Sequence, residues 1–311
     1  MTGMWFAGAR YREYRPCEAL RGWVRALFTF SEPGEDRSTR PALLDVQFEK
    51  SERFCAPTFA DAHLCIVFTF EKHYSPDGIW HRNSVRAGAD AIGPMTFPGP
   101  PSVPARAASI GAYFCAGATI PGAPAVELEN CVVPLDQVWG AEAGRLAEEL
   151  SSLPGETARL DRLESALLQK IGARRPKRAP IDIPGITFSI VQTGGQVEIE
   201  QLAGAAGLSR RHFTRVFREN VGVSPKIYCE LARFRSALGY VPCGENIEWA
   251  QVAADCGYAD QSHMIAEFRR FAGLTPQALV EGRWFHPFIE AAYRRGSHAT
   301  KSSFQTPSRA R

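Results

Sequence analysis

The sequence lacks the features that mark several classes of protein. Its eight cysteines form no CxxC pair and no Cys/His cluster with zinc-site spacing. The N-terminus has no signal-peptide pattern, and the most apolar run, residues 64–68, is too short to cross a bilayer. We therefore expect reduced thiols, a cytoplasmic location, no metal, no cofactor and no membrane partner.

Excess charge is also scarce. The net charge is only +3 over 311 residues, so the distribution of charge must indicate any nucleic-acid partner. The 45% hydrophobic and 22% charged residues are typical of a globular protein with a substantial core, and the length suits two domains.

The first 135 residues contain many Pro and Gly turn signals. Between these signals lie β-branched and aromatic stretches at 44–48, 64–70 and 110–115. Short strands with frequent turns predict a sandwich or a barrel. One early helix is expected over Cys17–Phe28, because its apolar residues recur at helical spacing.

From Leu135 to Ile171 the apolar spacing is helical, and Pro154-Gly155 divides the segment into two helices. Leucines at a seven-residue interval are typical of a dimer seam, but the Pro-Gly break favours a core-facing stripe. These leucines are Leu146, Leu153, Leu160 and Leu167.

We predict an α+β two-domain chain. Residues 1–171 form a β-rich, barrel-like domain that senses a signal or dimerises and ends in a helical pair. A basic linker over 172–180 leads to an all-α domain over 181–288 with two helix-turn-helix units. Residues 289–311 form a disordered tail.

An internal repeat lies within the second domain. Residues 201–207 match 251–257, and the pattern from His212 to Pro225 recurs from His263 to Pro276. Each copy has a short helix, a glycine able to take a left-handed conformation, an N-cap residue (Ser209 or Asp260) and a second amphipathic helix. This order is that of a helix-turn-helix unit.

The second helix of the first copy has a cationic exposed face, with little acid nearby in the sequence. A surface of this kind suits the major groove and its phosphates. Its residues are Arg210, Arg211, Thr214, Arg215 and Arg218.

The stretch ADCGYADQSHMIAEFRRFAGLTP, residues 254–276, carries a family resemblance. With it, residues 181–288 resemble the DNA-binding domain of AraC/XylS regulators, and Pro225–Leu238 resembles the rigid helix between the two units. The resemblance implies two recognition helices in successive major-groove segments, with base-facing Arg211, Thr214 and Arg215. It implies phosphate contacts by Arg210, Arg218 and Lys226.

The second unit departs from the family pattern. Many members carry a polar residue and an arginine where this chain has Ile265-Ala266, which offer only apolar contact, for example to a thymine methyl. The second unit therefore either reads bases directly or mainly clamps the backbone. Its expected DNA contacts are Gln261, Ser262, Ile265 and Arg269.

The N-terminal segment resembles more loosely a domain found on a subgroup of these regulators. The stretches that carry this resemblance are 14–20, 92–96, 111–118 and 132–136. The subgroup's Arg-Phe-Arg-Pro-Gly is replaced by residues 113–117, so its arginines are not inherited. Five residues of this segment either line a ligand pocket or pack in an ordinary barrel core, and we favour the barrel core. They are His63, Cys65, Phe68, Tyr113 and Cys115.

The expected function is transcription regulation without enzymatic activity, by activation or repression. The expected partners are double-stranded DNA, a small-molecule effector, a second copy in a homodimer and RNA polymerase. An alternative is a DNA-binding module fused to an alkyl-transfer repair enzyme with Cys17 as nucleophile, although no partner in the sequence activates that thiol. Another is a repeat that serves only protein contacts, which the arginine face argues against.

Overall fold

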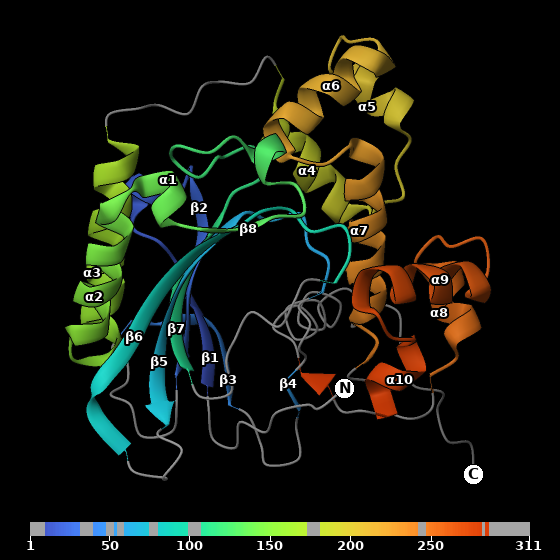
Figure 1. Cartoon of the computed structure of the whole chain (residues 1–311). Coiled ribbons are helices and arrows are strands. Elements are labelled where there is room, and N and C mark those ends of the chain that lie inside the picture. The colour runs from blue at the N-terminus through green and yellow to red at the C-terminus, as the bar shows by residue number, and fades with distance from the viewer. Residues whose placement is uncertain are drawn as a thin grey trace.

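The computed structural model describes residues 10–31, 40–47, 53–54, 59–74, 80–98, 107–172, 181–241, 247–281 and 284–285. An antiparallel sheet with helices along one face forms the N-terminal domain (Figure 1). A helical C-terminal domain lies on the side of the sheet away from those helices. The α+β two-domain prediction is therefore confirmed.

The sheet has seven strands in the order β3-β1-β2-β7-β5-β6-β8. Its outer strands pair on one side only in the described part of the chain, so the sheet is open, whereas a barrel-like domain was predicted. A parallel pair, β4 (Arg53–Phe54) and β9 (Trp284–Phe285), lies apart from it. The strands are β1 (Arg10–Tyr14), β2 (Val24–Ser31), β3 (Ala42–Gln47), β5 (Cys65–Tyr74), β6 (Trp80–Ile92), β7 (Ala107–Phe114) and β8 (Val132–Pro134).

Helices α1 (Asp136–Trp139), α2 (Ala141–Ser152) and α3 (Gly155–Ile171) follow the sheet, and α2 and α3 cover one of its faces. Leu146, Leu160 and Leu167 are buried in the same cluster as strand residues, and Leu153 is half-buried. The leucine repeat is therefore a core stripe and is not available as a dimer seam.

The predicted helix over Cys17–Phe28 is wrong. Only a single turn, η1 (Glu18–Leu20), is helical there, and β2 begins at Val24. Both faces of β2 are buried, because Leu27 packs toward the helices while the ring of Phe28 contacts that of Tyr113 on the other face, with the ring centroids 4.7 Å apart. A strand buried on both faces loses the polar–apolar alternation that would have distinguished it from a helix.

The C-terminal domain is entirely helical in its described part, apart from β9. Most of the predicted linker, residues 173–180, lies outside the described residues. The predicted tail, residues 289–311, lies outside them as well. No helix among the described residues is long and apolar enough to cross a membrane. The helices are α4 (Ile183–Gln192), α5 (Ile199–Ala205), α6 (Arg210–Val221), α7 (Pro225–Leu238), α8 (Trp249–Asp255), α9 (Gln261–Ala272) and α10 (Pro276–Glu281).

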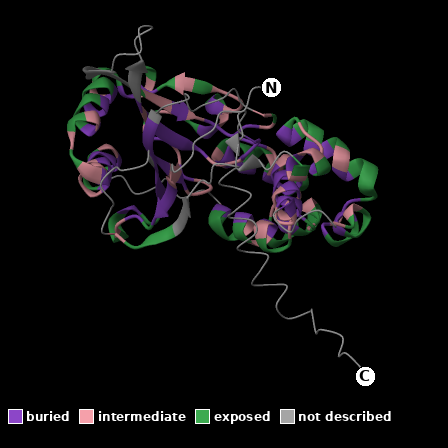
Figure 2. Cartoon of the chain, turned by 90° about the horizontal axis from the view of Figure 1, so that it is seen from below, coloured by how far each residue is buried: buried purple, intermediate pink, exposed green. Residues whose placement is uncertain are grey.

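Buried residues run through the sheet and along the inner faces of the helices, whose outer faces are exposed (Figure 2). One core cluster crosses between the domains. Residues 59–64, which we call the strap, precede β5 and reach the C-terminal domain, where Phe59 meets the ring of Phe234 edge-on at 6.1 Å. The Ala60 N–H donates to the Phe271 carbonyl at 2.8 Å. The strap thus completes a core that the sequence repeat alone would have left open.

Candidate nucleic-acid interface

The first helix pair consists of α5 and α6. Gly207 takes φ 68° in the turn between them, and the Ser209 hydroxyl accepts the His212 N–H at the start of α6. Phe213 and Phe217 are fully buried against α4 and α7, which fixes the face that α6 turns to the core. Gly222 ends the helix with φ 90°.

The second helix pair, α8 and α9, repeats this construction. Gly257 takes φ 74°, and the Asp260 carboxylate accepts the His263 N–H at 2.7 Å. Phe268 and Phe271 are fully buried, and Gly273 ends α9 with φ 71°. The predicted helices, caps and glycine turns of both copies are confirmed.

Helix α7 holds the two pairs in one fixed arrangement. Arg233 donates to the Gly257 carbonyl at 3.0 Å, and Glu230 accepts from Arg270 of α9 at 2.9 Å. Burial raises the pKa of Glu267 on α9, and Arg233 opposes that rise. These contacts link the interior of the second pair to the helix that packs against the first.

The exposed face of α6 carries the four predicted arginines, and the structure corrects the expectation of little acid nearby. Each of three arginines pairs with a carboxylate from a different element: Arg210 with Glu200 of α5 at 2.5 Å, Arg215 with Glu219 of α6 at 2.9 Å, and Arg218 with Glu129 of the N-terminal domain at 2.7 Å. Arg211 is exposed and makes no ion pair with any described residue.

Thr214 lies half-buried on α6, one turn after Arg210. On α9, Gln261, Ser262 and Ala266 are exposed and Ile265 is half-buried. These four positions of α9 therefore carry no charged side chain, in contrast with the positions that they match on α6.

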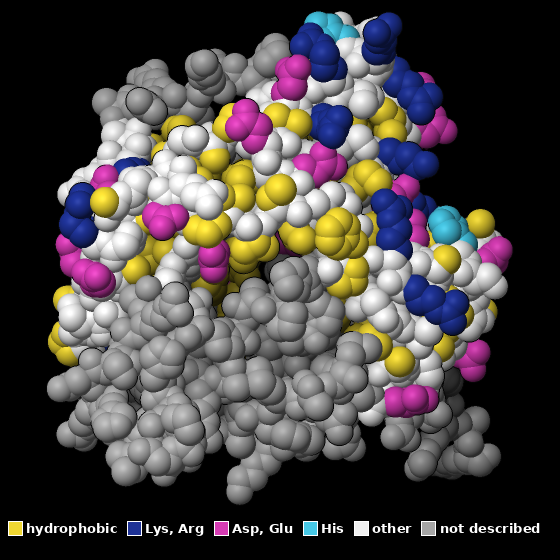
Figure 3. Space-filling view, in the orientation of Figure 1, with side chains coloured by type: hydrophobic (Ala, Val, Ile, Leu, Met, Phe, Trp, Pro, Cys, Tyr) yellow, Lys and Arg dark blue, Asp and Glu magenta, His cyan; other side chains and the backbone are white. Residues whose placement is uncertain are grey.

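Basic side chains form a row on one face of the C-terminal domain. Lys and Arg gather along the right-hand edge of Figure 3, over α6, the beginning of α7 and α9. Lys226 lies in the first turn of α7, and its Nζ atom is 3.7 Å from Glu230 Oε1. Arg269 of α9 is exposed. The row extends over both helix pairs, as a backbone-contacting surface must.

The strap carries a second, buried contact between the domains. Arg235 of α7 donates to the Asp61 carboxylate at 3.1 Å, and His63 Nδ1 lies 2.8 Å from the same oxygen. Burial tends to raise the pKa of Asp61, but Arg235 and His63 hold it well below its usual value. Burial lowers the pKa of His63, against the effect of Asp61.

The five residues predicted for a ligand pocket divide between the two faces of the sheet. Cys65 is paired in register with Tyr113, and both face the side on which Arg25 lies 4.9 Å above the Tyr113 ring. Phe68 is fully buried in the core beneath α2 and α3, and Cys115 packs against that core. The structure therefore groups Cys65 and Tyr113 with the strap residue His63, and places Phe68 and Cys115 elsewhere.

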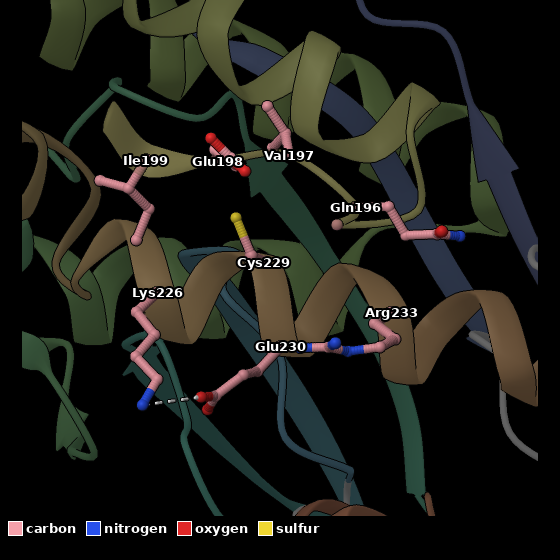
Figure 4. A pocket seen from close by; sticks show the side chains of 9 residues that line it. Gln196, Val197, Glu198, Ile199, Lys226, Cys229, Glu230 and Arg233 are labelled. Carbon is pink, nitrogen blue, oxygen red and sulfur yellow. Dashed lines mark ion pairs between the residues drawn. The ribbon is translucent and has the colours of Figure 1, made fainter. Parts of the chain in front are cut away.

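An open pocket of about 330 Å³ lies in the C-terminal domain, away from those five residues (Figure 4). The segment before α5 forms one wall and α7 forms the other. Its charges largely compensate, since Glu198 and Glu230 lie among Lys226 and Arg233. Among the described residues, no group of three or more His, Cys, Asp or Glu side chains is placed to hold a metal ion.

Sequence reasoning missed Asp61 and Glu129, which join the domains. Neither lies in a local pattern, and their partners are 174 and 89 residues away. The pair Asp61 and His63, two residues apart, is the sole local signal for the first, and the second has none.

Two helix pairs, each with a capped second helix, are joined by α7 and carry a basic row. This arrangement is that of a helix-turn-helix domain of the nucleic-acid-binding class. Residues 202–282 match the family described as "Helix-turn-helix domain". With the motif over residues 254–276, the C-terminal domain is of the AraC/XylS type.

Two curated relatives match part of the chain. An HTH-type transcriptional regulator of Mycobacterium tuberculosis is 33% identical over 105 residues, which are 34% of this chain and 40% of the relative. An uncharacterized HTH-type transcriptional regulator of Haemophilus influenzae is 32% identical over 78 residues, which are 25% of this chain and 26% of the relative. The chain thus spans less than half the length of either relative.

Solved structures resemble larger or smaller parts of the chain. The match to the DNA-binding domain of AdpA, in complex with a target DNA, covers 38% of this chain and 94% of the AdpA chain, with 25% identity and a TM-score of 0.26. The match to ToxT from Vibrio cholerae covers 73% of this chain and 92% of the ToxT chain, with 7% identity and a TM-score of 0.37.

Proposed function

We propose that this protein is a sequence-specific, DNA-binding transcription regulator in which α6 is the principal reading helix. The observation that carries the proposal is the exposed arginine face of α6, opposite the buried Phe213 and Phe217. A helix of this kind, capped and fixed by a packed partner, matches the width of the major groove. In known helix-turn-helix proteins the second helix of the unit enters the major groove, and α6 is the second helix of the first pair.

Arg211 and Arg215 are the proposed base readers, because a guanidinium donates two hydrogen bonds to guanine O6 and N7. Thr214 lies between them on the same face and suits a contact to a base edge. Arg210, Arg218 and Lys226 are the proposed phosphate contacts, which set orientation and affinity.

Helix α9 enters the next major-groove segment in this proposal and mainly holds the backbone. Gln261 and Ser262 lie at its N-terminus, within reach of phosphates or bases, and Arg269 adds a cation about two turns later. Ile265 contributes apolar contact, for example with a thymine methyl.

The N-terminal domain is the proposed sensor and dimerisation element of a cytoplasmic homodimer that contacts RNA polymerase. A small-molecule effector would lie near Cys65, His63 and Tyr113, where the sheet face carries aromatic and cationic groups. Equilibrium sedimentation tests the dimer: a monomer at micromolar concentration would contradict it.

The experiment that tests the main proposal is selection of bound duplexes from a random pool with the full chain. We expect enrichment of one family of DNA sequences. We also expect the logarithm of the binding constant to fall linearly with the logarithm of the salt concentration. Arg211→Ala should lose affinity, while Ser262→Ala, the matched position in the second pair, should lose much less. A pool without enrichment would contradict the proposal.

A further inference from the structure

One arginine of the proposed reading helix is held by the other domain. Arg218 of α6 donates to Glu129 at 2.7 Å, across 89 residues of sequence. Its side chain is 54% exposed and that of Glu129 is 22% exposed, so the arginine remains open to solvent on one side. A DNA phosphate approaching α6 therefore meets a cation that already has an anionic partner.

The turn that carries Glu129 is fixed to the sheet. It follows η2 (Ala125–Leu128), the short green helix beside α6 in Figure 1. The next residue, Asn130, takes φ 60°, and its side-chain oxygen accepts the Thr96 N–H at 2.7 Å. The Asn130 N–H donates to the Pro94 carbonyl at 2.8 Å. These bonds tie the turn to the end of β6, so Glu129 has a defined position.

The two domains meet closely at the same place. A Cβ atom on Gly222, the residue that ends α6, would lie 2.7 Å from Pro94 and 2.8 Å from the Ala125 carbonyl. The equivalent site in the second pair is looser, since a Cβ on Gly273 would meet nothing nearer than Pro98 at 3.6 Å. Arg269, which matches Arg218 in the repeat, makes no ion pair with any described residue.

We propose that Glu129 is an intramolecular competitor of the DNA phosphate at Arg218, so that the docked N-terminal domain competes with DNA at the first helix pair and not at the matching arginine of the second. The inference rests on the proposed function and adds its regulation. DNA binding must replace the carboxylate with a phosphate oxygen or pull the turn away from α6. A movement at the ends of β6 and β8, which border this turn, changes the strength of the competition.

The chain offers a matched control for the test. Glu127 is exposed, lies two residues from Glu129, and makes no ion pair with any described residue. Glu129→Gln and Glu127→Gln remove the same charge from the same turn. General repulsion of DNA changes equally in both variants, whereas competition at Arg218 is relieved in only one.

The experiment measures affinity of the full-length variants for the duplex selected from the random pool, at several salt concentrations. Glu129→Gln should tighten binding by about two- to fivefold, the range of a partly exposed ion pair, and steepen the salt dependence by up to about 0.9. Glu127→Gln should change affinity much less. In an Arg218→Ala background, Glu129→Gln should change affinity no more than Glu127→Gln does, whereas in an Arg269→Ala background it should keep its full effect.

A second readout needs no DNA. Hydrogen exchange at the C-terminal turn of α6 should be faster in Glu129→Gln than in the parent or in Glu127→Gln. Unchanged affinity and exchange in Glu129→Gln, equal gains in both glutamine variants, or a gain that persists without Arg218 would overturn the competition. If no duplex binds while the exchange result holds, the contact stands and the proposed function fails.

Discussion

The two helix pairs share one framework but differ in what they expose and in what completes them. The first pair has four arginines on its proposed reading helix and a core whose fully buried residues all come from its own domain. The second pair keeps only one of these four arginines, Arg269 in place of Arg218, and its core includes Phe59 and Ala60 from the strap. The repeat therefore preserves packing and caps, while the exposed positions and the outside support have diverged.

The largest effect is expected for Phe59→Ala. Phe59 is 1% exposed and lies against Phe234, so the substitution leaves a cavity in the second pair and should lower the free energy of unfolding by about 3–5 kcal/mol. Denaturant unfolding followed by circular dichroism measures this, with the 65% exposed Phe188→Ala as control. Equal losses in the two variants would show that the strap does not support the second pair.

A loss of about 3 kcal/mol is expected for Asp61→Asn, because the substitution removes the carboxylate that Arg235 and His63 both contact in a largely buried site. The folded-state pKa of Asp61 is depressed, so the carboxylate stabilises the fold above its unfolded pKa, about 4, and this contribution is lost as the pH falls toward the folded pKa. Unfolding curves of parent and variant should converge as the pH falls below about 4. A constant difference between them would contradict the ion pair.

Arg215→Ala gives the first pair the residue that the second has at this position, Ala266. Specific binding should weaken by about 1–3 kcal/mol, with relaxed discrimination at one or two base pairs. Affinity for the selected duplex and for its single-base variants measures both. Unchanged affinity and base preference would remove Arg215 from the reading face.

The reverse change, Ala266→Arg, restores an arginine to the second pair and should strengthen binding by about 1 kcal/mol through a new phosphate or base contact. The same duplex serves for the measurement. A fall in affinity would instead identify Ile265-Ala266 as an adapted apolar contact.

Local chemistry made the C-terminal domain predictable. The caps at Ser209 and Asp260 and the glycine turns are short-range signals, and the structure places each where the repeat predicted it. The strands over 44–48, 64–70 and 110–115 were found for the same reason. The helix predicted at Cys17–Phe28 failed because a strand buried on both faces has no alternation.

The contacts between the domains could not be predicted. The pairs Arg235–Asp61 and Arg218–Glu129 join segments far apart in sequence, and nothing local in either segment selects its partner. The same holds for the acids beside Arg210 and Arg215. Without the fold, the α6 face reads as purely cationic, whereas three of its four arginines are paired.

The central claim is that α6 reads bases while α9 mainly holds the backbone. Selection from a random pool, followed by affinity measurement for every single-base variant of the selected duplex, tests it most directly. We predict one strongly specified block containing guanine and, about 10 base pairs away, a weakly specified one. Two equally specified blocks, or a stronger block that does not weaken with Arg215→Ala, would contradict the account.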